Sequence, residues 1–179
     1  MKERINIIGP SASGKTTVAE RLSQFTEIEL YKTDNLLFEL NSAGGLIKTP
    51  REDFESKIIS IISDNNWILE GKYFSQHVFN RADSIIFTDT NFLLCLENQW
   101  KRFFNDENQI DKYGLAKNLR LSINIVRQHS GLYSTKKIQE HNRIFSRNKL
   151  KVMLLEYEEK LLILKRPEEI EHYLHLFSS

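Results

Sequence analysis

The sequence predicts an α/β fold, in which a parallel sheet of five strands is covered by helices on both faces. Short apolar segments alternate with segments of helical periodicity. The apolar segments lie at 4–8, 27–32, 66–71, 83–89 and 161–165. The first of them is rich in isoleucine, as a buried central strand should be, and runs directly into a glycine-containing loop and then a helix. A length of 179 residues suits one domain, 1–179.

The loop after the first strand fits the phosphate-binding pattern G-x-x-x-x-G-K-[ST]. Backbone N–H groups of such a loop, and of the helix that follows it, converge on phosphate oxygens. We expect Lys15 to reach the β- and γ-phosphates of a nucleotide and the Thr16 hydroxyl to ligate Mg²⁺. The predicted nucleotide-binding residues are Gly9, Pro10, Ser11, Ala12, Ser13, Gly14, Lys15, Thr16 and Thr17.

Acidic residues stand at the ends of the next two strands. Asp34 follows the strand at 27–32, and Glu70 closes the strand at 66–71. Ligands of open α/β sheets bind at the carboxyl edge, so we expect both carboxylates near the phosphate loop. Asp34 is expected to orient or deprotonate an acceptor hydroxyl, the alternative being a helix N-cap. Glu70 is expected to act on Mg²⁺ or its waters, the alternative being an ordinary loop glutamate.

The segment 35–65 is predicted to be helical and to lie on the acceptor side. Leucines and Phe38 within 36–40 indicate a short helix, and 41–45 reads as a flexible turn. A longer helix begins at Thr49-Pro50, with Thr49 as its cap and Pro50 in its first turn. Arg51 either serves a phosphate or is solvated. Lys72 and Arg81 are possible anion contacts.

The second half of the chain supplies candidate basic residues. A helix capped by Asn91 carries a core stripe with the single cysteine, Cys95, which we expect to be a packed thiol. Arg102 near its end is a candidate catalytic residue. After a polar loop at 105–114, helices at 115–128 and 135–159 are predicted, so that 105–160 forms a helical lid or cover. Its dispersed basic residues either stabilise phosphoryl oxygens or lie on a solvated surface. They are Arg120, Arg127, Lys136, Arg143 and Arg147, of which Arg143 is taken as the catalytic candidate.

Composition excludes several classes of protein. Hydrophobic residues make up 40% of the chain and charged residues 27%, so a core can form. The net charge of +1 gives no support for a nucleic acid or an anionic membrane as partner. One cysteine allows no internal disulfide, and we find neither a signal peptide nor a membrane span, which suits the cytoplasm. The five histidines lack metal-ligand spacing.

Several segments together resemble a known family. They are the phosphate loop, 31–34, 49–54, 67–73, 82–87 and 164–169. In this order they look like the adenylate-kinase-related P-loop proteins called DNA topology modulation proteins. The resemblance implies a three-layer, nucleotide-kinase-like P-loop NTPase fold with sheet order 2-3-1-4-5 and a mobile lid. It also implies that Asp34 contacts the acceptor, that Glu70 serves the metal site and that the loop near Arg166 flanks the adenine.

We therefore expect an ATP-dependent phosphotransferase that uses ATP and Mg²⁺. Its acceptor is a small molecule, either a nucleoside or nucleoside monophosphate, as the resemblance implies, or a hydroxy acid, which suits Asp34 equally well. One alternative is a nucleotide-binding regulatory protein with little or no kinase activity. Another is a slow stand-alone NTPase. The sequence leaves the oligomeric state open.

Overall fold

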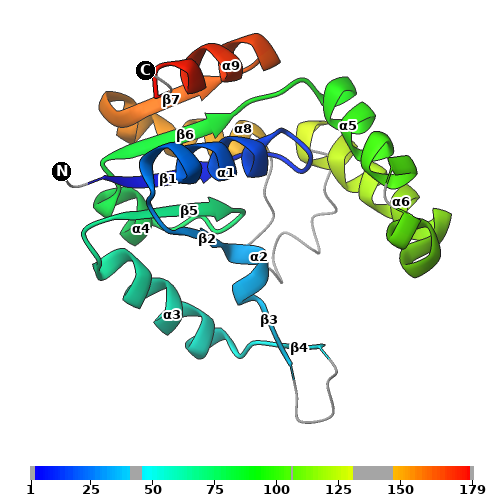
Figure 1. Cartoon of the computed structure of the whole chain (residues 1–179), viewed down its shortest axis with the longest axis horizontal. Coiled ribbons are helices and arrows are strands. Elements are labelled where there is room, and N and C mark those ends of the chain that lie inside the picture. The colour runs from blue at the N-terminus through cyan, green and yellow to red at the C-terminus, as the bar shows by residue number, and fades with distance from the viewer. Residues whose placement is uncertain (1–2, 41–45, 106, 131–146, 178–179) are drawn as a thin grey trace.

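The computed structural model describes residues 3–40, 46–105, 107–130 and 147–177. Its central sheet has five parallel strands in the order β2-β5-β1-β6-β7. In that order they span Leu30–Lys32, Trp67–Gly71, Arg4–Ile8, Ser84–Thr88 and Leu161–Leu164. Counted in chain order among these five strands alone, the sheet order is 2-3-1-4-5. In Figure 1 the strands point toward the side where α5 (Phe92–Asn105) and α6 (Glu107–Ser130) lie.

Helices cover both faces of the sheet, with a hydrophobic core on each face. One core contains residues of α1 (Lys15–Thr26) and α9 (Pro167–His175). The other contains residues of α3 (Arg51–Ser63), α4 (Gln76–Arg81) and α8 (Arg147–Leu154). Alternation along β5 places Trp67 and Leu69 in the second core and Ile68 in the first. Glu70 therefore shares the face of Ile68 and lies on the side of α1.

The segment after β2 differs from the expected helix. The helix α2 spans only Thr33–Leu36, and Phe38–Leu40 forms a strand, β3, that pairs antiparallel with β4 (Leu46–Lys48). A short apolar run is compatible with either helix or strand, and here pairing with a second segment decides. The backbone N–H of Thr49 donates to Leu37 O (2.9 Å) beyond the hairpin. The hairpin extends away from the sheet beside α3 (Figure 1).

Two further details of the expected helices are corrected. The residue preceding α3 is Pro50, and the buried Thr49 hydroxyl has no hydrogen-bond partner, so Thr49 does not cap α3. The polar stretch after α5 is helical rather than a loop. The helix α6 begins at Glu107 and continues past Gly114, whose own backbone is not helical (φ of +59°). Asn91 does cap α5, accepting the N–H of Leu93 (2.8 Å).

The C-terminal part agrees with the expected strand and last helix. Of the helix expected at 135–159, the residues before 147 lie outside the described part; α8 is followed by a 3₁₀ helix, η1 (Leu155–Lys160). Pro167 occupies the start of α9, where its missing N–H costs nothing. No helix within the described ranges combines the length and apolar character needed to cross a membrane.

Candidate active site

The phosphate loop joins β1 to α1 at the carboxyl edge of the sheet. Gly14, the residue before α1, has φ of +92°, a conformation that glycine adopts without steric cost. Ala12 also has a positive φ, +58°. The predicted arrangement of strand, glycine loop and helix is thus present. The N–H groups at the start of α1 form the kind of helix terminus that binds anions.

Hydroxyl groups fix the shape of this loop. The Ser13 hydroxyl donates to Pro10 O (2.8 Å) and lies 2.6 Å from the Thr88 hydroxyl at the end of β6. The Thr90 hydroxyl donates to Ser13 O (2.8 Å). All three side chains are buried, so water does not weaken the polar contacts that fix the loop. Such a loop is preorganised for a ligand on its outer side.

Lys15 is buried beneath the loop with its charge poorly compensated. Its side chain is 6% exposed, and Nζ donates to Pro10 O at 2.7 Å. Burial, together with the charge of Lys72, lowers its pKa to about 8, although Glu70 and Asp34 act in the opposite direction. No carboxylate within the described residues lies at salt-bridge distance from it. A buried ammonium of this kind is suited to an anionic ligand.

Glu70 faces the start of α1 from the neighbouring strand. It pairs in register with Ile7 of β1 on one side and with Lys32 of β2 on the other. Burial raises the pKa of its carboxyl group, and Asp34 adds to the rise; the charge of Lys15 and the nearby hydroxyl of Thr16 oppose it. Glu70 and Thr16, the two predicted metal-site residues, therefore lie together.

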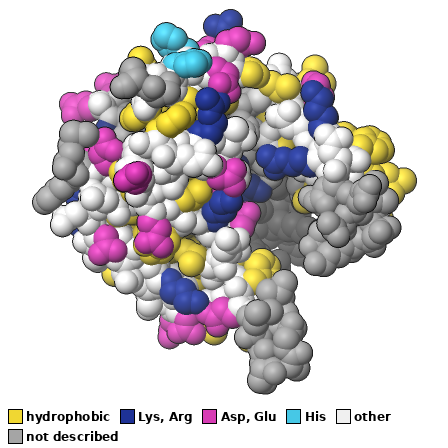
Figure 2. Space-filling model, viewed as in Figure 1, with side chains coloured by type: hydrophobic (Ala, Val, Ile, Leu, Met, Phe, Trp, Pro, Cys, Tyr) yellow, Lys and Arg dark blue, Asp and Glu magenta, His cyan; other side chains and the backbone are white. Residues whose placement is uncertain are grey.

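Asp34 lies in the first turn of α2, immediately beyond β2, and its side chain is exposed. The end of β2 before it pairs with the end of β5, where Glu70 and Lys72 lie, and its charge acts on Lys15, Glu70 and Lys72. Close packing of Gly71 against Thr33 holds the ends of β5 and β2 together: a Cβ on Gly71 would lie 1.7 Å from Thr33 Oγ1. Figure 2 shows basic and acidic side chains side by side where this face of the molecule is hollowed.

Three further side chains contact the loop, and of these Lys72 was predicted as a possible anion contact. Lys72 Nζ donates to the hydroxyl of Ser11, and the backbone N–H of Ser11 donates to Gln128 Oε1 (3.0 Å). Asn98 Nδ2 donates to Ala12 O (3.1 Å). Lys72 follows Glu70-Gly71 directly and was identifiable from the sequence as an anion contact. Asn98 and Gln128 come from α5 and α6, and no sequence pattern marks them.

An ion cluster around a buried carboxylate at the end of β6 also escaped prediction. The Asp89 carboxylate is inaccessible to solvent and pairs with both Arg147 and Lys151 of α8; the second Arg147 contact measures 2.9 Å and the Lys151 contact 2.7 Å. The adjacent Cys95 is fully buried, and burial raises its pKa to about 11, so it is the expected packed thiol. Arg147 is therefore not simply solvated.

The remaining candidates are dispersed. Arg102 is exposed, one turn beyond Asn98 on α5 and thus on the same side of that helix. Arg143 lies outside the described residues. Arg166 is exposed beside α9 and pairs with Glu169 (2.9 Å), and Thr17 is exposed in the first turn of α1. α9 does approach the loop, since a Cβ on Gly14 would lie 3.5 Å from Ile170 Cδ1.

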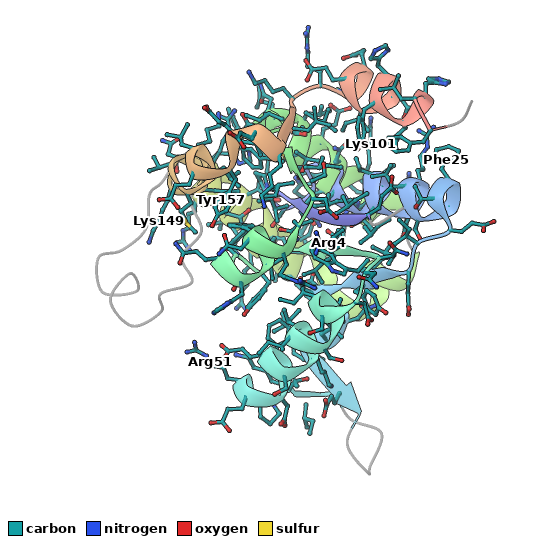
Figure 3. All side chains as sticks on the ribbon, turned by 90° about the vertical axis from the view of Figure 1, so that its left-hand side faces the viewer. Arg4, Phe25, Arg51, Lys101, Lys149 and Tyr157 are labelled. Atoms are coloured by element: carbon teal, nitrogen blue, oxygen red, sulfur yellow. The ribbon has the colours of Figure 1, made fainter. Side chains whose placement is uncertain are left out.

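Two other arginines have structural contacts instead. Arg51 is exposed and pairs with Glu55 (2.7 Å) one turn along α3; Figure 3 shows its side chain pointing outward. Arg81 Nε donates to Ile62 O (3.1 Å) at the end of α3. Neither contact requires a phosphate. No group of three or more metal-ligating side chains occurs among the residues that the structure describes.

Known proteins similar to this chain were found among solved structures. A sugar kinase from Janibacter sp. HTCC2649 is 16% identical over 98% of this chain and 94% of its own, with a TM-score of 0.47. A gluconokinase from Sinorhizobium meliloti 1021 is 13% identical over 99% and 92%, with a TM-score of 0.48. A shikimate kinase from Aquifex aeolicus is 18% identical over 67% and 80%, with a TM-score of 0.36.

No protein-family model matches the chain, and neither does any curated protein. The resemblance to DNA topology modulation proteins therefore stays a prediction. The solved structures share low identity with this chain, so we base the assignment of function on the side chains of the site.

Proposed function

We propose that this chain is an ATP-dependent phosphotransferase that moves the γ-phosphoryl group of ATP to a small acceptor. The observation that supports this most strongly is the grouping of Lys15, Thr16, Glu70 and Asp34 around a preformed phosphate loop. Phosphoryl transfer needs positioning and charge stabilisation above all, and these groups supply both.

The residues present fit a magnesium ion. Mg²⁺ prefers oxygen ligands and is usually held by one or two protein groups together with substrate phosphates and water. The Thr16 hydroxyl and the Glu70 carboxylate offer that donor set. When bound, Mg²⁺ would neutralise charge on the β- and γ-phosphates.

The protein's own groups would perform the remaining work. Lys15 and the N–H groups at the start of α1 would bind the phosphates. Asp34, whose side chain is exposed, would orient the acceptor hydroxyl. As the acceptor oxygen bonds to phosphorus, the bond to the ADP oxygen breaks and the acceptor proton passes to the Asp34 carboxylate. Arg102 is retained as a further basic candidate, and Arg166 as a candidate contact near the adenine.

The acceptor class is the open part of this proposal. A nucleoside or nucleoside monophosphate follows from the resemblance to DNA topology modulation proteins. A sugar or a hydroxy acid suits Asp34 equally, because the carboxylate requires only a hydroxyl within reach. The solved structures named above include kinases described as acting on sugars, gluconate and shikimate, and these compounds belong in the same panel.

A second candidate function is regulatory. Helices α5 and α6 contact the backbone of the loop through Asn98 and Gln128. A nucleotide that displaces these contacts would change how the helices sit, and a protein partner could read that change. In this case ATP would bind tightly without turnover.

The experiment that tests the proposal is ADP release from Mg-ATP against a panel of nucleosides, nucleoside monophosphates, sugars and hydroxy acids. Lys15→Met is the matched control, because it removes the ammonium and preserves the length of the side chain. Release that depends on an acceptor, in the wild type only, would support a kinase and identify its substrate class. Release without acceptor would favour an NTPase, and binding without release would favour the regulatory function.

A further inference from the structure

Ser11, the third residue of the phosphate loop, has two side-chain partners, one an ammonium donor and the other an amide oxygen acceptor. Its hydroxyl accepts a hydrogen bond from the ammonium of Lys72, which follows β5. Its backbone N–H donates to the side-chain oxygen of Gln128 on α6, at 3.0 Å. A loop N–H that donates to an uncharged oxygen and a cation that donates to a hydroxyl thus meet at one residue.

The surroundings of Lys72 leave its charge without a direct counterion. Its ammonium contacts a neutral hydroxyl, and within the described ranges no carboxylate lies at salt-bridge distance. Its side chain is exposed, and partial desolvation of the ammonium lowers its pKa, which Asp34 and Glu70 partly offset. Lys72 and Lys15 also repel one another, since the charge of Lys72 lowers the pKa of Lys15.

The two ammonium groups contact neighbouring residues of the loop, since Lys15 Nζ donates to Pro10 O (2.7 Å) and Lys72 Nζ donates to the Ser11 hydroxyl. A polyanion bound at the loop would give each cation an opposite charge. The two lysines enter from different strands: Lys15 follows β1 and Lys72 follows β5, the strand that carries Glu70. Lys72 is therefore nearer than Lys15 to the side on which Asp34 lies, and that is the acceptor side of the proposed reaction.

We propose that Lys72 is a second phosphate-binding cation, which contacts the terminal phosphoryl group that is transferred, while Lys15 serves the β- and γ-phosphates together. Gln128 Oε1 accepts the Ser11 N–H that a phosphate oxygen would accept in this role, and Lys72 donates to the Ser11 hydroxyl. This inference rests on the proposed function, because it assigns one residue a role in that reaction. Lys72 would be a catalytic residue, since it would touch the reacting group.

A purely structural role for Lys72 predicts something different. If its contact with Ser11 only ties the end of β5 to the loop, its loss would weaken the binding of every nucleotide to a similar extent. If it binds the terminal phosphate, its loss would weaken ATP-like ligands and spare ADP. The ratio of the two affinities therefore separates the roles, and unchanged ADP binding would show that the variant is folded.

The test is isothermal titration of the whole protein with ADP and with a non-hydrolysable β,γ-imido analogue of ATP, both with Mg²⁺. We compare the wild type with Lys72→Met, Lys72→Arg and the control Lys101→Met. Lys101 is exposed and pairs with Glu97 on α5 (2.7 Å), so its loss should change neither affinity. One charge-assisted hydrogen bond corresponds to a change in affinity of about 10- to 100-fold.

We expect Lys72→Met to weaken the analogue about 10-fold or more, to change ADP binding less than about 2-fold, and Lys72→Arg to restore part of the difference. Equal weakening of both ligands, or no change in either, would overturn the inference while leaving nucleotide binding intact. A wild-type protein that binds neither ligand would overturn the inference and the proposed function together. Selective loss of analogue binding without any acceptor-dependent turnover would support Lys72 as a terminal-phosphate contact and count against the kinase.

Discussion

Replacing Lys15 with methionine should make the free protein more stable while it removes nucleotide binding. Lys15 is buried and its pKa is lowered from 10.5 to about 8. Below about pH 8 the folded chain therefore holds a charge in a poorly solvated place, whereas the unfolded chain keeps that charge in water. Methionine fills similar space without the charge.

The magnitude follows from the difference between the two pKa values. A shift from 10.5 to about 8 corresponds to a penalty of roughly 3 kcal/mol, which is complete below pH 8. The variant also loses the hydrogen bond to Pro10 O, which lowers its stability by about 1 kcal/mol. At pH 7 the variant should thus gain about 2 kcal/mol, or about 4–8 °C in melting temperature for a domain of this size.

The sign of the pH dependence gives a second measurement on the same pair of proteins. Between about pH 8 and 10.5 the unfolded wild type binds more protons than the folded one, so its stability should rise with pH across this window. Urea unfolding at several pH values should show that rise in the wild type and lose the part due to Lys15 in the variant. Parallel pH curves for the two proteins, or a less stable variant at pH 7, would refute the reasoning.

Four more substitutions test the site and the backbone of the chain. Asp34→Asn should lower kcat about 10²- to 10⁴-fold with ATP-analogue affinity retained, and an unchanged kcat would remove Asp34 from the chemistry. Glu70→Gln should raise the Mg²⁺ concentration needed for half-maximal activity about 10- to 100-fold, measured by magnesium titration. Gly71→Ala should destabilise the fold by about 3 kcal/mol, since its φ is +144° and the new methyl group would overlap Thr33. Gly114→Ala should cost about 1–3 kcal/mol in the same urea experiment although no atom crowds the position, because its backbone conformation (φ of 59°, ψ of 167°) is essentially restricted to glycine.

The parts of the fold that were predictable are those with strong local signals. The run Arg4–Ile8, the loop ending in Lys15 and the strand closed by Glu70 follow from short apolar segments next to distinctive polar residues. Parallel strands bring such ends to one edge, so Asp34 could be placed beside the loop without coordinates. Alternation along β5 puts Glu70 on the face of the sheet that α1 covers, and Thr16 lies at the start of α1.

The parts that were missed depend on contacts between distant residues. Gln128 is 117 residues from Ser11, and nothing in a helical segment indicates which amide will reach a loop. The strand Phe38–Leu40 was predicted to be helical. An apolar run this short has no periodicity that separates helix from strand, and pairing with β4 decides its structure. Asp89 looked like a strand end, and its two cationic partners come from α8.

The buried carboxylate of Asp89 has a consequence for the order in which the chain acquires its site. Its cationic partners follow it by 58 residues in the case of Arg147, and Lys151 comes later still. The two residues that flank it, Thr88 and Thr90, hold the phosphate loop through Ser13. During synthesis from the N-terminus the residues of the loop are therefore made early. The charge of Asp89 can be neutralised by Arg147 and Lys151 only after α8 has been synthesised. Nucleotide binding should accordingly be among the last properties that a newly made molecule gains, and fragments that end before α8 should lack it.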